Sequence, residues 1–258
     1  MASLPSVFLS HGSPMHALQP GEAGLVWTAL GKRLGKPKAI VIASAHWETN
    51  VPMVTGSARP ETIHDFFGFP EPLYRLRYRA PGAPAVAQEA SRLLKEHGIT
   101  AAIDGCRGLD HGAWAPLLFM YPEADVPVVQ LSLQPELGTR HHLALGRALR
   151  KLEEENVLVI GSGHMTHNLR DWMRGRGQPT PYAAEFAEWV REKLEAHDLD
   201  TLADYRSRSP HGVRAHPTDE HFLPLFVALG AARDGYQPER VFKSLDAGVL
   251  AMDAYLFS

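Results

Sequence analysis

The chain has 258 residues, of which 45% are hydrophobic and 21% are charged, values that exclude the disordered and fibrous classes of protein. Lys and Arg number 26 against 29 Asp and Glu, so the net charge of −3 gives no electrostatic reason to bind nucleic acid or an anionic membrane. The single cysteine, Cys106, excludes an internal disulfide and a cysteine-based zinc site, whereas 14 histidines offer many metal ligands.

Predicted strands and helices alternate along the chain. Uninterrupted apolar runs, typical of strands buried on both faces, lie at 6–10, 39–44, 126–132 and 157–161. Stretches with helical spacing of apolar residues lie at 24–34, 83–97, 140–154 and 183–197. The tail 249–257 is expected to add a late, antiparallel edge strand. This alternation predicts an α/β protein, a three-layer α/β/α domain around a largely parallel, mixed sheet.

The whole chain, 1–258, is interpreted as one catalytic domain. It contains no internal repeat and no long linker, and the polar segment 206–217 is too short to separate two domains. The first ten residues lack the basic and apolar regions of a secretion signal, and no apolar run approaches the ~20 residues of a membrane span. We therefore expect a cytoplasmic protein without a nucleic-acid or membrane partner.

Histidines follow three of the predicted strands. His11 comes directly after the first strand, His46 after the second, and His164 and His167 after the run that ends at Gly161. Small residues precede each of them and leave room for a ligand near the backbone. Because ligands of open α/β sheets bind beyond the carboxyl ends of the strands, His11, His46 and either His164 or His167 are expected at one rim.

Two more histidines occupy suggestive turns. His111 lies in a polar turn ahead of a predicted helix, and His221 lies next to Glu220 on the turn that leads to Pro224 at a helix start. His64 is surrounded by aromatic residues that pack the core or wall a pocket, and the core is the favoured interpretation. The remaining histidines considered are interpreted as ordinary surface or loop residues, namely His16, His97, His141, His142, His197 and His211.

Taken together, several segments resemble the class III extradiol ring-cleaving dioxygenases, and most closely their 4,5-DOPA dioxygenase branch. The resemblance spans nearly the whole chain and rests on His11-Gly12-Ser13-Pro14, Ser44-Ala45-His46-Trp47, Thr62-Ile63-His64-Asp65-Phe66, Asp110-His111-Gly112, His167-Asn168-Leu169 and Pro217-Thr218-Asp219-Glu220-His221-Phe222-Leu223-Pro224-Leu225. It implies a non-haem Fe(II) enzyme, or one isolated with Zn(II), that opens a DOPA-like catechol with O2.

The same resemblance implies roles for individual residues. His11, His46 and His221 would be the metal ligands, and His167 the acid/base residue beside the metal, which some descriptions of the family count among the ligands. His111 would contact the substrate and assist catalysis, and His64 would belong to the substrate-binding residues.

One departure from the better-known relatives bears on the metal. They complete the site with a glutamate, whereas this chain has His221 with Glu220 beside it, and either residue could be the third ligand. Three histidines also suit zinc, so a zinc hydrolase of a small ester or amide is the second hypothesis. A non-enzymatic binding protein with the same fold is the third. The sequence leaves open the catechol side chain, to which Arg75, Arg77 and Arg79 could offer charge, and whether the chain forms a homo-oligomer.

Overall fold

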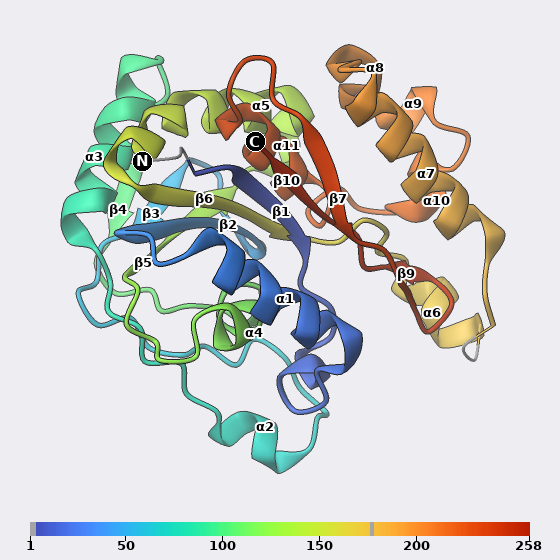
Figure 1. The fold of residues 1–258 in the computed structure, drawn as a ribbon, viewed down its shortest axis with the longest axis horizontal. Coiled ribbons are helices and arrows are strands. Elements are labelled where there is room, and N and C mark those ends of the chain that lie inside the picture. The colour runs from blue at the N-terminus through green and yellow to red at the C-terminus, as the bar shows by residue number, and fades with distance from the viewer. Residues whose placement is uncertain (1–3, 176–177) are drawn as a thin grey trace.

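An eight-stranded mixed sheet forms the centre of the protein in a computed structural model, which describes residues 4–175 and 178–258 (Figure 1). Its strand order is β4-β3-β5-β2-β6-β1-β10-β7. The strands are β1 (Ser6–Ser10), β2 (Ala39–Glu48), β3 (Met53–Thr55), β4 (Ala102–Asp104), β5 (Val128–Leu133), β6 (Val157–Gly163), β7 (Pro238–Phe242) and β10 (Ala254–Phe257). A separate hairpin joins β8 (Leu245–Asp246) to β9 (Leu250–Ala251).

The pairing confirms the largely parallel, mixed sheet that the sequence predicts. The four central strands β5, β2, β6 and β1 are parallel to one another. The sheet turns antiparallel where β3 meets β5 and where β10 and β7 follow β1. The predicted late strand exists as β10 and is antiparallel, but it lies inside the sheet because β7 pairs with its outer side.

Helices cover both faces of the sheet, which makes the three predicted layers (Figure 1). They are α1 (Gly21–Leu34), α2 (Glu71–Arg75), α3 (Pro84–Glu96), α4 (His111–Met120), α5 (Gly138–Leu149), α6 (Leu169–Gly175), α7 (Pro181–Glu195), α8 (Leu199–Ala203), α9 (Tyr205–Arg208), α10 (Gly212–Ala215) and α11 (Leu223–Ala231), with short 3₁₀ turns η1 (Pro14–Ala17), η2 (Pro135–Leu137) and η3 (Arg150–Glu155). The polar segment 206–217 contains the end of α9 and all of α10.

Alternate residues of the central strands enter different cores. In β2, Ile40 and Ile42 pack in the cluster formed with α1 and α4, whereas Val41 and Ala43 pack in the cluster formed with α3, α5 and α11. Every strand residue from Ala39 to Ala45 is buried. This two-sided burial is the physical reason why the strand has an unbroken apolar sequence.

The parallel register brings three histidines to one level. Ser162 of β6 pairs with Leu9 of β1 on one side and with Ser44 of β2 on the other. His11, His46 and His164 each lie two residues beyond this row. His11 and His164 directly follow β1 and β6 as predicted, whereas His46 lies inside β2, because this strand continues to Glu48. A ligand crevice forms at this end of an open α/β sheet.

A glycine at the end of β6 lets a fourth histidine join them. A Cβ atom on Gly163 would lie 2.1 Å from the carbonyl oxygen of His221, so only glycine permits this approach. The amide of the next residue, His164, donates a hydrogen bond to the same oxygen over 2.8 Å. The turn before α11 is thereby held directly on the strand end.

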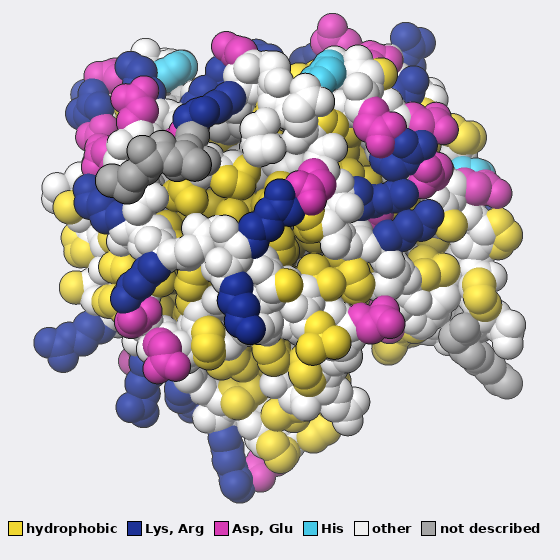
Figure 2. Space-filling view, viewed as in Figure 1, with side chains coloured by type: hydrophobic (Ala, Val, Ile, Leu, Met, Phe, Trp, Pro, Cys, Tyr) yellow, Lys and Arg dark blue, Asp and Glu magenta, His cyan; other side chains and the backbone are white. Residues whose placement is uncertain are grey.

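The surface seen in Figure 2 carries basic and acidic side chains interspersed with one another, in keeping with the small net charge of −3. Within residues 4–175 and 178–258, the longest apolar helices fall short of what would be needed to cross a membrane.

Candidate metal centre

A cavity of about 700 Å³ opens at the carboxyl ends of the central strands. Seven imidazoles line it, those of His11, His16, His46, His111, His164, His167 and His221. Apolar side chains, among them Phe66, Phe69, Leu169 and Trp172, form other parts of its wall. The cavity therefore combines a histidine-rich floor with a surface that suits an aromatic molecule.

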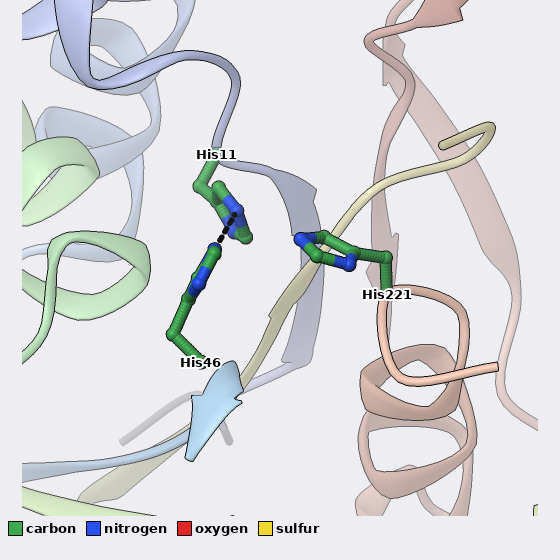
Figure 3. Close-up of side chains that lie close together, drawn as sticks. All are labelled: His11, His46 and His221. Atoms are coloured by element: carbon green, nitrogen blue, oxygen red, sulfur yellow. Dashed lines mark hydrogen bonds between the residues drawn. The ribbon is translucent and has the colours of Figure 1, made fainter. Parts of the chain in front are cut away.

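Three of these imidazoles converge on one point although they come from three distant segments of the chain. Potential ligand atoms of His11, His46 and His221 all lie within 4.8 Å of one another. Figure 3 shows the three rings pointing toward a common space, with the Nε2 atoms of His11 and His46 3.1 Å apart.

Polar groups on the far side of each ring fix which nitrogen carries the proton. The Ser162 hydroxyl donates to the carbonyl of Gly112, so its oxygen accepts a proton from His11 Nδ1, 3.0 Å away. The Asp65 carboxylate lies 3.3 Å from His46 Nδ1. The carboxylate of Glu220 lies 2.9 Å from His221 Nδ1. Each Nδ1 thus carries the hydrogen and each Nε2 is left with a lone pair.

These lone pairs face one another without a proton between them. For a hydrogen bond between the two Nε2 atoms, one of the rings would have to carry its hydrogen on Nε2 and none on Nδ1. That Nδ1 would then face the Asp65 carboxylate or the Ser162 oxygen, and neither of these offers it a hydrogen. Within the part of the chain that the structure describes, the buried Nε2 of His221 has no hydrogen-bond partner at all. A cation between the three nitrogens satisfies all of them, as in histidine-ligated metal sites whose outer nitrogens donate to carboxylates or hydroxyls.

Burial keeps the three imidazoles neutral. It lowers the pKa of His11 and of His221 well below 6.5, and it lowers the pKa of His46 to about 3, with the neighbouring His111 adding to the effect. At pH 7 all three rings are therefore neutral, each with a single N–H hydrogen. A neutral imidazole is the form that binds Zn(II) or Fe(II), so the donor set fits a divalent transition metal.

Asp65 connects the metal centre to His111. Its carboxylate accepts hydrogen bonds from the backbone amide of His111 (2.9 Å) and from His111 Nδ1 (2.8 Å). Burial raises the pKa of Asp65, but the bonds from His111 outweigh this and bring the pKa to about 2. Because the ionised carboxylate holds Nδ1, the Nε2 atom of His111 is available to a molecule in the cavity.

His167 lies against the third imidazole of the cluster. Its ring stacks on that of His221, with 3.4 Å between the centroids and 14° between the planes. Burial lowers the pKa of His167 to about 3, so the ring is neutral at pH 7. His167, Glu220 and His221 also have ligand atoms within 4.8 Å of one another, which places His167 at the edge of the centre.

The remaining candidate histidines divide between the cavity and the core. His164 lines the cavity, and its ring centroid lies 5.1 Å from that of His11. His64 is not among the lining residues, and its Nε2 lies 3.1 Å from the carbonyl of Leu76. It packs against Phe66, which does line the cavity, so the aromatic segment both joins the core and walls the pocket.

Two histidines interpreted as ordinary surface residues are corrected by the structure. His142 is fully buried. Its Nε2 accepts a hydrogen bond from the backbone amide of Gln134, and its Nδ1 contacts the carbonyl oxygen of Gly138. His16 lines the cavity. It lies on η1, a short 3₁₀ turn that Ser13 caps and that the sequence analysis did not predict.

Sequence reasoning also missed the residues that orient the imidazoles. Ser162 is one of the small residues before His164 and Asp65 belongs to the motif around His64, but neither pattern predicts that the residue orients an imidazole. A signal for Ser162 was present, since its position on β6 matches that of Ser44 on β2. No comparable signal existed for Asp65, because it reaches His46 and His111 from an irregular segment.

The chain is similar to known proteins over nearly all of its length. Residues 5–248 match the family model described as the catalytic LigB subunit of aromatic ring-opening dioxygenase. The chain is 41% identical to a 4,5-DOPA dioxygenase extradiol of Beta vulgaris, over 97% of this chain and 95% of that protein. It is 40% identical to the protein of that name from Escherichia coli (strain K12), over 96% and 93%. The crystal structure of an uncharacterized protein from Escherichia coli K12 superposes with a TM-score of 0.85 at 34% identity, covering 99% of this chain and 100% of that one.

Proposed function

This chain belongs to the LigB family of aromatic ring-opening dioxygenases and is an extradiol ring-cleavage enzyme, and from this premise we propose that it opens a catechol beside its two hydroxyl groups with Fe(II) and O2. The three Nε2 lone pairs of His11, His46 and His221 carry the metal part of the proposal. Three protein ligands on one side of a metal leave positions for the catechol oxygens and for O2.

His221 is proposed as the third ligand rather than Glu220. The Glu220 carboxylate already accepts hydrogen bonds from His221 Nδ1 and from the Thr218 hydroxyl, at 2.9 and 3.0 Å. A carboxylate bonded to the outer nitrogen of a histidine typically orients a metal ligand and does not itself bind the metal. When bound, the metal would lower the pKa of a catechol hydroxyl and hold the ring next to O2.

His167 is proposed as the acid/base residue. Its ring is neutral and stacked on a ligand, so it can take the proton of a catechol hydroxyl that lies at the metal and return it later in the reaction. His111 is proposed to contact the substrate oxygen through Nε2. Because Asp65 holds its other nitrogen, His111 accepts a proton there or, once protonated, donates a hydrogen bond with its orientation unchanged.

The apolar wall has a separate part in the proposal. Phe66, Phe69, Leu169 and Trp172 offer faces and edges to a planar ring and keep water away from it. His64 supports this wall from behind, through its contact with Phe66, and is kept as an indirect substrate-binding residue. The substrate proposed is a DOPA-like catechol, the compound in the names of the relatives from Beta vulgaris and Escherichia coli.

The family assignment favours this function over the two other hypotheses. A zinc hydrolase or a binding protein could use the same imidazoles, but the proteins that match over nearly the whole chain are dioxygenases.

We further propose that residues 1–258 act as one domain, that the protein works in the cytoplasm, and that it needs no nucleic acid or membrane. The exposed, unpaired thiol of Cys106 suits a reducing compartment. A homo-oligomer is compatible with these proposals.

Metal loading tests the proposed reaction. Metal-free protein is loaded anaerobically with Fe(II) or, as a control, with Zn(II), and is then mixed with a panel of catechols under air. We expect oxygen uptake and a new visible absorption from a ring-opened semialdehyde acid with Fe(II) only. If iron-loaded protein consumes no oxygen with any catechol, or if zinc-loaded protein hydrolyses small esters instead, the proposal is wrong.

A further inference from the structure

The outer part of the cavity contains a carboxylate that the metal centre does not use. Asp246 lies at the end of β8 and lines the cavity, with 38% of its side chain exposed. No hydrogen bond to its side chain occurs within residues 4–175 and 178–258, and its only ionic neighbour there is His16, whose Nε2 is 3.9 Å from Asp246 Oδ2. Asp246 is thus a carboxylate without a bonded donor, facing a ligand cavity.

The neighbouring imidazole also presents an acceptor. His16 Nδ1 lies 3.1 Å from the carbonyl oxygen of Ser13, which can only accept, so Nδ1 carries the proton. In neutral His16 the lone pair is on Nε2 and faces the carboxylate. Two acceptors 3.9 Å apart cannot bond each other, but a group with several N–H donors between them can bond both.

This pair lies close to the metal centre. Gly12, the residue after His11, has φ +70°, and a Cβ atom there would lie only 2.6 Å from His16 Nδ1. The imidazole of His16 therefore packs on the backbone beside a proposed metal ligand, and Asp246 lies on the other side of His16 Nε2 from this ring. Because this pair and the three imidazoles line the same cavity, a ring held at the metal can direct a side chain toward the pair.

The hairpin that carries Asp246 is fixed in place. The Thr166 hydroxyl donates to the carbonyl of Val249 and accepts from the amide of Ala251, both over 2.7 Å, and the amide of Thr180 donates to Gly248. Thr166 directly precedes His167, so the segment with the proposed acid/base residue also anchors the hairpin. A fixed carboxylate can select a substrate, because its position does not adapt to a mismatched charge.

We propose that Asp246, assisted by His16, is a specificity-determining residue that binds an ammonium group on the side chain of the catechol. The inference rests on the proposed function, since it assumes that the catechol ring is held at the metal centre. None of the described residues that line the cavity is Lys or Arg, so a side chain whose only charge is a carboxylate meets repulsion from Asp246 without a compensating cation. The enzyme therefore favours catechols with a cationic or zwitterionic side chain over neutral ones, and neutral ones over anionic ones.

Three catechols with the same two-carbon spacer test this order, namely dopamine with an ammonium group, 4-ethylcatechol with no charge and hydrocaffeate with a carboxylate. We measure kcat/KM with iron-loaded enzyme and, independently of turnover, the Kd of each compound by anaerobic calorimetry. The wild type should prefer dopamine to 4-ethylcatechol by about fivefold, the upper range for a partly exposed ion pair, and should disfavour hydrocaffeate.

Substitution of the carboxylate then assigns the effect to one residue. Asp246→Asn should remove the preference for dopamine and leave 4-ethylcatechol unchanged, and Asp246→Lys should favour hydrocaffeate. Asp200→Asn, a change of a fully exposed aspartate on α8, is the matched control and should behave as the wild type does.

The outcomes separate the inference from the function on which it rests. Cleavage of 4-ethylcatechol without any advantage for dopamine, or an equal loss with all three compounds in Asp246→Asn, overturns the role of Asp246 and leaves the dioxygenase intact. Binding of dopamine in the expected order without oxygen uptake contradicts the proposed reaction and supports the binding role. Failure of all three catechols to bind contradicts both.

Discussion

Replacement of Glu220 distinguishes a residue that orients a metal ligand from a residue that binds the metal. In Glu220→Gln the amide oxygen still accepts the Nδ1 proton of His221, so the ring keeps its orientation and only the negative charge is lost. Removal of an orienting partner weakens metal binding by about 10- to 100-fold, and the retained acceptor puts this substitution near tenfold.

Replacement of His221 itself has a larger effect. In structural zinc sites with four protein ligands, roughly 10–16 kcal/mol of binding free energy corresponds to about 2.5–4 kcal/mol per ligand. His221→Ala should therefore weaken metal binding by at least about a hundredfold. The effect is larger than that of Glu220→Gln because His221→Ala removes the Nε2 atom itself, the atom that has no hydrogen-bond partner among the residues that the structure describes.

Competition with a chromophoric chelator measures both affinities for Zn(II) and Co(II) under the same conditions. Glu136→Gln, a change of an exposed glutamate of η2, serves as the matched control, and the thermal melt of each metal-free variant checks that it is folded. The reasoning is refuted if Glu220→Gln loses the metal while His221→Ala retains it, because that order would make Glu220 the ligand.

Four further results are expected. Ser162→Ala removes the acceptor of His11 Nδ1 and should weaken Zn(II) binding by about tenfold in the same chelator assay, and unchanged affinity would contradict the assigned tautomer. His11→Ala and His46→Ala should lose the metal itself, which elemental analysis measures. His167→Ala should retain the metal but lose about 10²–10⁴ in turnover of the iron enzyme, and a variant of normal rate would exclude an acid/base role. Metal-free protein should lose stability as the pH falls from about 6.5 toward 4, because burial lowers the pKa of His142 to about 4 and of His216 to about 3. Unfolding lets these histidines regain protons, so the free energy of unfolding falls by up to about 1.4 kcal/mol per histidine and pH unit, and a urea midpoint that does not change over this range would contradict the argument.

The sequence by itself determined the architecture because the evidence for it is local. Each central strand is buried on both faces, so it requires an unbroken apolar run, and the run that includes Ile40 and Val41 is visible without knowledge of its neighbours. The short strands β3 and β4 were not predicted. Each pairs over only three residues, and β4 is partly exposed, so neither needs a distinctive apolar pattern.

The sequence also indicated that His11 and His46 would meet, since the carboxyl ends of parallel strands share one edge of the sheet. It identified the family through motifs spread over nearly the whole chain. It could not place His16 or Asp246 in the cavity. One lies on a 3₁₀ turn and the other on a two-residue strand, and neither position follows from a period or a register.

The tertiary structure alone decided which imidazole nitrogens face the space shared by His11, His46 and His221. The proton position on each imidazole depends on Ser162, Asp65 and Glu220, and two of these reach their histidine from distant segments of the chain. Such contacts depend on distance and orientation in space, which residue spacing does not encode. Burial and strand pairing could thus be predicted from the sequence, whereas the proton positions on the imidazoles depend on contacts that form only in the folded protein.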